Sequence, residues 1–214
     1  VRMVATPRQP PLVVVDSQWQ TPLNAALWGP AFDVSLRDVD GDGHLDATVC
    51  NDMGNIAAPN RVFLGDGALG LTPRDGDGLD LRLSCMGLSW GDTDADGALE
   101  LFVAESRAHY LLDHEGDGAW YATAAAEGLV ARFGPRDMVW GSTLEDFDND
   151  GRPDLGVSGR AANKALLLVN TFGPVCPYPS FARAGRLRVP LGGGNPAAIV
   201  SGDWDGDANL DLAV

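Results

Sequence analysis

Residues 38–46 read DVDGDGHLD, a stretch with four aspartates and two glycines. Like charges a few ångströms apart repel each other, so such a loop needs a cation or abundant water to offset the charge. The pattern returns as DTDADGALE at 92–100, DFDNDGRPD at 146–154 and DWDGDANLD at 203–211. We call these four stretches the first to fourth acidic loops. Their starts are 54, 54 and 57 residues apart, and such a fixed period indicates stacked or radially arranged repeats.

Short runs of β-branched, aromatic and aliphatic residues flank every acidic loop, which is typical of strands separated by turns. AFDVSL precedes the first loop and LDATV follows it, as MGLSWG precedes and LELFV follows the second loop. Further along the first and second units come RVFLGD and HYLLDH. Each unit thus offers three or four strands in about 54 residues, the size of a propeller blade. We predict an all-β fold, a β-propeller, over a stacked solenoid, whose β units are commonly shorter. The best helical candidate is residues 121–133, limited to a turn or two by Gly128.

The repeats run along nearly the whole chain, so we expect one propeller domain over residues 1–214. Two arrangements fit the position of the strands. The N-terminal run PLVVVD could complete the last blade of a closed four-bladed ring, or the four blades could belong to a larger propeller, for example a seven-bladed one. The end of the sequence within the apolar run LDLAV favours the larger propeller.

Each acidic loop has the oxygen donors that calcium prefers. Aspartates at alternate positions of a curled loop point toward one centre, a ninth carboxylate closes the set, and the seventh residue offers its backbone carbonyl. Five or six such oxygens suit the flexible coordination of Ca²⁺ better than the near-ideal octahedron of Mg²⁺. We therefore predict up to four calcium ions. The expected ligands are Asp38, Asp40, Asp42, His44 and Asp46; Asp92, Asp94, Asp96, Ala98 and Glu100; Asp146, Asp148, Asp150, Arg152 and Asp154; and Asp203, Asp205, Asp207, Asn209 and Asp211.

The sixth loop residue, where the chain turns sharply, is glycine in three loops and Ala208 in the fourth. Glycine adopts positive φ freely, whereas alanine in the left-handed region costs about 1 kcal/mol. We expect the fourth site to be the weakest or slightly reshaped.

Two other interpretations of the acidic loops are less consistent with the sequence. An EF-hand requires a bidentate glutamate at its twelfth position and flanking helices, but all four twelfth residues are valines within apparent strands. Solvated turns would not place four acidic sets in matched register. Four Ca²⁺ would change the formal charge from −15 to −7. The stretches LGDGALG, RDGDGLD and HEGDGAW lack the full spacing and are interpreted as hairpin turns.

Composition excludes several classes of function. A net charge of −15 argues against nucleic acid as a partner, and no apolar stretch is long enough to predict a membrane span.

Cys50, Cys85 and Cys176 could form one disulfide with one thiol left over, but the sequence does not select the pair. The favoured interpretation of each cysteine is a small buried apolar residue.

We predict that the protein is not an enzyme, because no nucleophile, metalloprotease or phosphate-loop motif occurs. The histidines are His44, within the first acidic loop, and His109 and His114, which we expect at the surface.

Residues 90–104 (WGDTDADGALELFVA) and 144–159 (LEDFDNDGRPDLGVSG), with RVFLGDGALG and YLLDHEGDGAW, resemble the FG-GAP/VCBS repeat family. This family includes the calcium-binding blades of integrin α-subunit propellers and the VCBS repeats of ASPIC/UnbV-type extracellular proteins. The resemblance implies a β-propeller, seven-bladed in many members, with Ca²⁺ in loops within the blades. It also implies secretion or surface display. Glu100 and Ala208 depart from the family pattern and bear on the affinity of their sites.

The expected function is therefore that of a calcium-binding extracellular module for cell adhesion or for binding a protein or glycan. The alternatives are a propeller enzyme, a lyase or hydrolase acting on polysaccharide, and a passive scaffold within a larger secreted protein. The identity of the ligand and the oligomeric state stay open.

Overall fold

The computed structural model describes residues 29–68, 70–106, 109–114, 119–123, 138–159, 164–172, 181–183 and 198–213. Within these ranges the chain is all β, without a helix. The first sheet consists of β1 (Ala31–Arg37), β2 (Asp46–Asn51), β3 (Arg61–Gly65) and β4 (Leu71–Arg74). The second consists of β5 (Cys85–Gly91), β6 (Glu100–Glu105), β7 (His109–His114) and β8 (Trp120–Ala122). The third consists of β9 (Val139–Glu145), β10 (Asp154–Gly159), β11 (Lys164–Asn170) and β12 (Phe181–Arg183), and β13 (Val200–Gly202) pairs with β14 (Asp211–Ala213).

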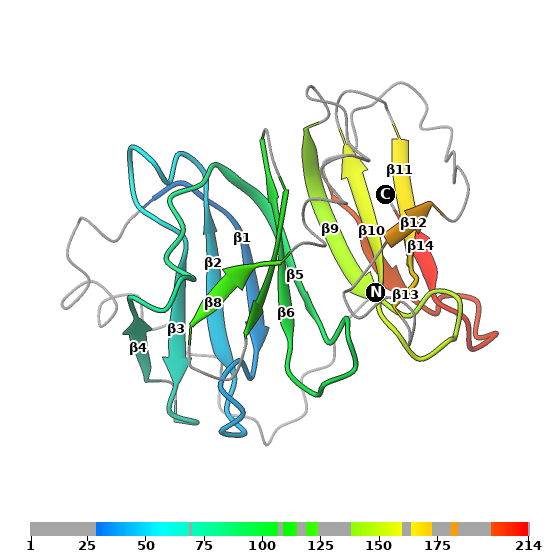
Figure 1. Ribbon diagram of the computed structural model, residues 1–214, viewed down its shortest axis with the longest axis horizontal. Coiled ribbons are helices and arrows are strands. Elements are labelled where there is room, and N and C mark those ends of the chain that lie inside the picture. Colours follow the sequence, from blue (N-terminus) through cyan, green and yellow to red (C-terminus); the bar gives the residue numbers. More distant parts are fainter. Residues whose placement is uncertain are drawn as a thin grey trace, which may run out of the picture.

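The strands of each sheet pair antiparallel and in chain order, which is the topology of a propeller blade. The first strands of successive sheets lie next to each other: β5 contacts β1 and β9, and β9 contacts β13. Figure 1 shows the sheets following one another across the molecule in the order of the sequence. The prediction of an all-β, propeller-type fold is confirmed, and we call each sheet a blade. The number of blades and the extent of the domain stay predictions.

The helical candidate at 121–133 is wrong where the structure describes it, because Tyr121 and Ala122 belong to β8. Residues 124–133 and the run PLVVVD at 11–16 lie outside the described residues.

The first strands of three blades carry a bulge at the same place. The register shifts leave Phe32, Met86 and Trp140 as the extra residues of β1, β5 and β9. A bulge bends its strand and increases the local twist. The rings of Phe32 and Trp140 lie 6.0 Å apart although they belong to the first and third blades. The first strands of these blades therefore converge, as they do around the axis of a propeller.

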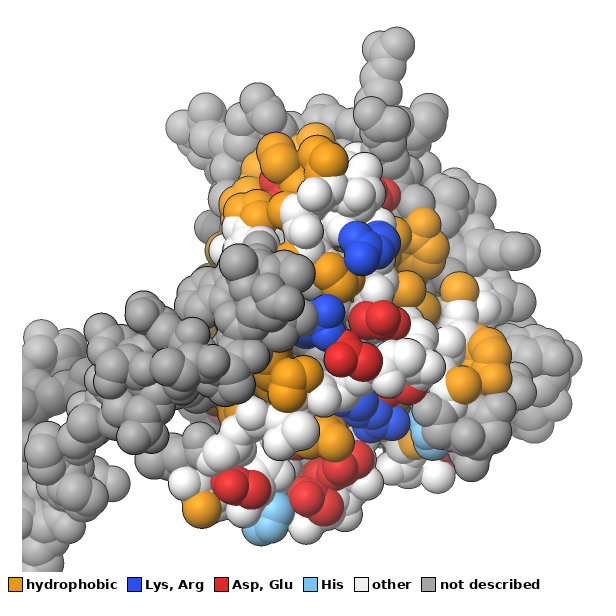
Figure 2. Space-filling view, turned by 90° about the vertical axis from the view of Figure 1, so that its left-hand side faces the viewer, with side chains coloured by type: hydrophobic (Ala, Val, Ile, Leu, Met, Phe, Trp, Pro, Cys, Tyr) orange, Lys and Arg blue, Asp and Glu red, His pale blue; other side chains and the backbone are white. Residues whose placement is uncertain are grey.

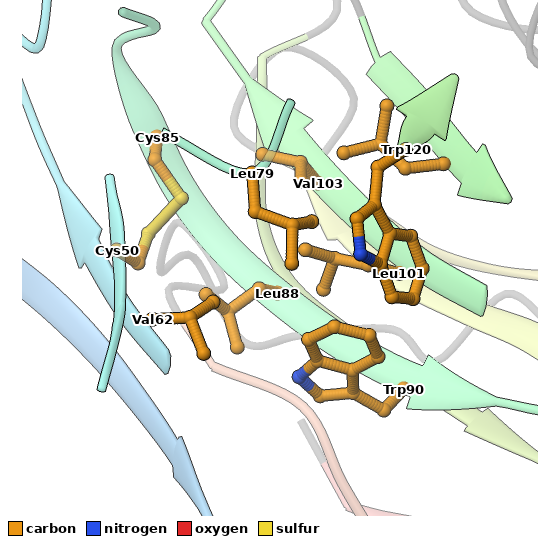
Figure 3. Packing of buried hydrophobic residues seen from close by; sticks show 10 residues of the cluster. Cys50, Val62, Leu79, Cys85, Leu88, Trp90, Leu101, Val103 and Trp120 are labelled. Atoms are coloured by element: carbon orange, nitrogen blue, oxygen red, sulfur yellow. A yellow bond between two sulfur atoms is a disulfide. The ribbon is translucent and has the colours of Figure 1, made fainter. Parts of the chain in front are cut away.

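Two hydrophobic clusters fill the spaces between neighbouring blades. Alternate residues of β6 contribute to the two clusters. Leu101 and Val103 belong to the cluster between the first and second blades, and Phe102 and Ala104 belong to the cluster between the second and third. The cluster between the first and second blades also holds Trp90 and Trp120, whose rings make an edge-to-face contact at 5.4 Å (Figure 3). The second blade is thus buried on both faces.

Glycine allows the first strands of neighbouring blades to approach closely. A Cβ added at Gly87 of β5 would lie 2.5 Å from the carbonyl oxygen of Trp140 in β9. Gly141, 54 residues later, meets the backbone of Ile199 in the same way. Larger side chains at these positions would push the blades apart.

The structure corrects the interpretation of two cysteines. Cys50, in β2, and Cys85, in β5, form a disulfide with a Cα–Cα distance of 5.4 Å. Both are fully buried, as predicted for apolar cysteines, but they are bonded to each other rather than free. The sequence alone does not show that the ends of β2 and β5 meet across the boundary between blades. Cys176 lies outside the described residues.

The surface prediction for His109 is also wrong. Its side chain is only 3% exposed, and its ring packs near Phe102 at 6.1 Å. His109 lies on the same face of β7 as the fully buried Leu111, two residues later, and this face packs into the cluster between the second and third blades. His114, at the end of the same strand, is half-buried and packs against Trp120.

Candidate metal centres

The four acidic loops occupy the same place in each blade, between its first and second strands. Because the first strands run in the same direction, all four loops emerge on one side of the molecule, the lower side in Figure 1. Figure 2, turned about the vertical axis, shows acidic side chains at the lower edge of its visible face and others near its middle.

Backbone amides hold the first carboxylate of each loop. In every loop, the amide of the sixth residue donates a hydrogen bond to the first aspartate. The N···O distances are 2.9 Å from Gly43 to Asp38, 3.1 Å from Gly97 to Asp92, 2.8 Å from Gly151 to Asp146 and 3.1 Å from Ala208 to Asp203. The loop therefore wraps around its first carboxylate.

The next two carboxylates follow the same rule. The third residue of each loop accepts from the amide of the fifth at 3.1 to 3.2 Å. The fifth residue accepts from the amide of the seventh at 2.7 to 3.0 Å. The seventh residues, His44, Ala98, Arg152 and Asn209, are thus positioned by their amides. Their role as carbonyl ligands stays a prediction.

Two positions of each loop have positive φ. At the sixth, the predicted turn is present, and Ala208 adopts it with φ of 70° like the glycines of the other loops. The positive φ expected at the sixth residue is confirmed, while a weaker or reshaped fourth site stays a prediction. The fourth position was missed. Its residues are Gly41 (76°), Ala95 (61°), Asn149 (61°) and Gly206 (80°). Glycine or asparagine at three of these four places was the available signal.

Carboxylate oxygens converge in each loop. In the second loop, one oxygen from each of the four predicted acidic ligands lies within 4.8 Å of the others. Three predicted acidic ligands converge in each of the remaining loops. The sets are Asp92, Asp94, Asp96 and Glu100; Asp38, Asp40 and Asp42; Asp146, Asp148 and Asp154; and Asp203, Asp205 and Asp211.

Three predicted ligands stand outside these sets. Asp46 uses both oxygens in hydrogen bonds, from the amides of Val39 at 2.7 Å and Gly65 at 2.8 Å. Asp150 forms an ion pair with the Arg152 guanidinium. Asp207 is exposed, and hydrogen bonds from Asn209 lower its pKa.

The ninth residue of each loop connects the loop to the blade. It accepts a hydrogen bond from the amide of the second loop residue in all four loops. In the first and third loops its other oxygen accepts from the end of the third strand, at 2.8 Å from Gly65 to Asp46 and 2.8 Å from Asn170 to Asp154.

Glu100, the ninth residue of the second loop, departs from this arrangement. Its Oε2 accepts from both the amide and the hydroxyl of Thr93, the hydroxyl at 2.7 Å. The amide of His114, which corresponds to that of Gly65, donates instead to Asp113. Sequence reasoning missed Thr93; the signal was a hydroxyl where the other loops have Val39, Phe147 and Trp204.

Two buried carboxylate oxygens of the second loop have no hydrogen-bond partner: Asp92 Oδ1 and Glu100 Oε1. Burial raises the pKa of Glu100 to about 8, against the effect of its hydrogen bonds from Thr93, and burial also raises the pKa of Asp94. Leaving a buried acceptor unpaired costs about 1–3 kcal/mol. A hard divalent cation would compensate the negative charge of these carboxylates and would coordinate the two oxygens that lack a partner. The donor set therefore fits Ca²⁺.

The comparisons with known proteins agree with the repeat. The model of the FG-GAP-like repeat matches residues 38–103 and 92–157, so each match begins at the first aspartate of an acidic loop. A search of curated proteins found no match.

Solved structures give a more distant likeness. One match is the crystal structure of BBS1N in complex with ARL6DN, soaked with lead, with 13% identity and a TM-score of 0.49. It covers 84% of this chain and 50% of the other, so the present chain spans about half the length of that structure. Among the described residues, no helix is long and apolar enough to cross a membrane.

Proposed function

The chain belongs to the FG-GAP-like repeat family, and from this premise we propose that it is a calcium-binding, extracellular β-propeller module that binds a protein or a glycan. The observation that carries the calcium proposal is the second acidic loop. There, four acidic side chains converge, and Asp92 and Glu100 each keep a buried oxygen without a hydrogen-bond partner.

Up to four ions are proposed, one in each acidic loop. The second site is the most complete, because four carboxylates supply oxygens there and three do so in each other loop. We propose the fourth site as the weakest, because its sixth residue is an alanine at positive φ where the other loops have glycine, and because its converging ligands, like those of the first loop, are more exposed than those of the second and third. The carbonyls of the seventh residues would complete coordination spheres of the size that Ca²⁺ requires.

The proposed role of the ions is structural. Without a cation, each loop holds several like charges within a few ångströms, and their repulsion opposes the turn. A bound ion would cancel this repulsion and fix the connection between the first and second strands of the blade. The rim formed by the four loops would then be a rigid surface for a partner.

An extracellular location is supported by the disulfide. The Cys50–Cys85 bond is the kind of cross-link that forms and persists in oxidising compartments. We propose a binding module rather than an enzyme, because the sequence offers no catalytic motif. A glycan and protein array probed with and without calcium would identify the partner. Release of sugar products from a polysaccharide would instead establish the enzyme.

Isothermal titration calorimetry tests the calcium proposal. Protein stripped with EGTA should bind up to four Ca²⁺, and Glu100→Gln should weaken the binding at one of them. Asp80→Asn is the matched control, since Asp80 belongs to the stretch RDGDGLD and lies outside the acidic loops. Absence of calcium binding at millimolar concentration, or a Glu100→Gln isotherm identical to that of the unmodified protein, would contradict the proposed sites.

A further inference from the structure

Four fully buried polar residues form a continuous path between the second and third acidic loops. They are Thr93 and Glu100 of the second loop, Asp154 of the third loop and Asn170 at the end of β11. Each has 0% of its surface exposed. Burying polar groups is costly unless they are hydrogen-bonded, so the hydrogen bonds along the path constrain both loops.

Each step of the path is a hydrogen bond. Thr93 donates to Glu100 through its amide and its hydroxyl. The Asn170 side-chain amide donates to the backbone carbonyl of Thr93 at 2.7 Å, and the Asn170 backbone amide donates to Asp154 Oδ1 at 2.8 Å. The Asn170 Oδ1 accepts from the amide of Phe172 at 3.0 Å, so the side chain is fixed at both ends.

The path crosses from one blade to the next. Thr93 lies between β5 and β6 of the second blade, whereas Asn170 ends the third strand of the third blade, 77 residues later. It joins the closing carboxylates of two metal centres, Glu100 and Asp154. A displacement of one carboxylate therefore changes the hydrogen bonds that hold the other.

Among the three described four-stranded blades, only the third makes this link. The residues at the equivalent place in the strand register are Gly65, His114 and Asn170. Gly65 has no side chain to reach a neighbouring loop. The His114 ring packs against Trp120 of its own blade.

We propose that the cation sites of the second and third acidic loops are coupled through Asn170, so that filling one raises the affinity of the other. This inference rests on the proposed calcium function. A cation in the third loop would hold Asp154, and through Asn170 it would hold the Thr93 backbone. The second loop would then lose less conformational freedom when its own cation binds, which is the basis of positive coupling.

The test uses the full chain, with the first site disabled by Asp40→Asn and the fourth site disabled by Asp205→Asn. Calcium binding to the second site is measured by calorimetry, with the third site intact or disabled by Asp148→Asn. Asp148 is not part of the hydrogen-bonded path. We expect Asp148→Asn to weaken the second site about fivefold or more, the usual range for coupled sites.

The role of Asn170 is tested by Asn170→Ala and by Asn170→Leu, which keeps the number and branching of the side-chain heavy atoms. In these backgrounds Asp148→Asn should leave the affinity of the second site unchanged. Asn209→Ala is the matched control, because it removes the only described side-chain link between the third and fourth loops, Asn149 to Asn209 at 2.9 Å, and should preserve the coupling.

The outcomes are distinguishable. Absence of calcium binding in the unmodified protein would overturn the proposed function. Normal binding with a second-site affinity indifferent to Asp148→Asn would overturn the coupling alone, whether or not the Asn170 variants fold. Coupling that persists in folded Asn170 variants would overturn the assignment to Asn170.

Discussion

Cys50 and Cys85 form a disulfide that ties the second strand of the first blade to the first strand of the second blade. Both sulfurs lie in the hydrophobic cluster between these blades, beside Val62 and Leu88 (Figure 3). Among the described residues, the blades otherwise adhere through side-chain packing and through hydrogen bonds such as that from the Leu88 amide to Asp33. The disulfide therefore adds a covalent link at the boundary between two sheets, where the fold is least continuous.

Removal of this disulfide should destabilise the protein substantially. The bond closes a segment with a sequence separation of 35 residues, and the chain-entropy model gives about 4 kcal/mol for a loop of that size. We expect Cys50→Ala with Cys85→Ala to lower the free energy of unfolding by about this amount in urea titrations. Cys176→Ala, which keeps the disulfide, is the control. An equal loss in both variants would contradict the structural role of the bond.

Calcium should raise the thermal stability of the chain. At a free concentration 100-fold above its dissociation constant, a ligand stabilises the native state by about 2.7 kcal/mol per site. For a domain of this size, 1 kcal/mol corresponds to about 2–4 °C in Tm. We therefore expect EGTA to lower the Tm by several degrees in differential scanning calorimetry. Sodium chloride at matched ionic strength is the control, and an unchanged Tm would mean that calcium does not stabilise the fold.

The parts of the fold that repeat locally were predictable from the sequence. The acidic loops recur at a nearly fixed spacing, and in the runs around them apolar and polar residues alternate as they do in strands. The turn at Ala208 followed from comparison with the glycines in the other loops, since each loop must form the same curve. Such features depend on neighbours within about ten residues of the chain.

Features that depend on contact between blades were not predictable in the same way. The pairing of Cys50 with Cys85 requires the ends of β2 and β5 to meet, and no local pattern reports that distance. His109 looks like a turn residue in the sequence but is buried by packing. Asn170 looks like the polar end of a strand, and its bond to Thr93 exists only because two blades pack together.

The strained turn of the fourth loop predicts a substitution that should stabilise the protein. Ala208 has φ of 70°, and glycine would adopt this conformation without the penalty of about 1 kcal/mol for a Cβ. Ala208→Gly should therefore raise the free energy of unfolding by up to about 1 kcal/mol and tighten the fourth site. Ala213→Gly, within β14, should instead destabilise the strand. If Ala208→Gly lowers stability in urea, the strain assigned to this turn is wrong.

Close packing of the blades predicts a large effect from a single methyl group. A Cβ on Gly87 would lie 2.5 Å from the Trp140 carbonyl oxygen, which belongs to the backbone and has little room to retreat. We expect Gly87→Ala to cost about 1–3 kcal/mol, the usual penalty for overpacking. Ser89→Ala is the matched control on the same strand. It removes the hydroxyl that donates to Ser142 at 3.2 Å, for a net loss of about 1 kcal/mol. A smaller loss for Gly87→Ala than for Ser89→Ala would mean that β5 and β9 separate more easily than their backbone contact implies.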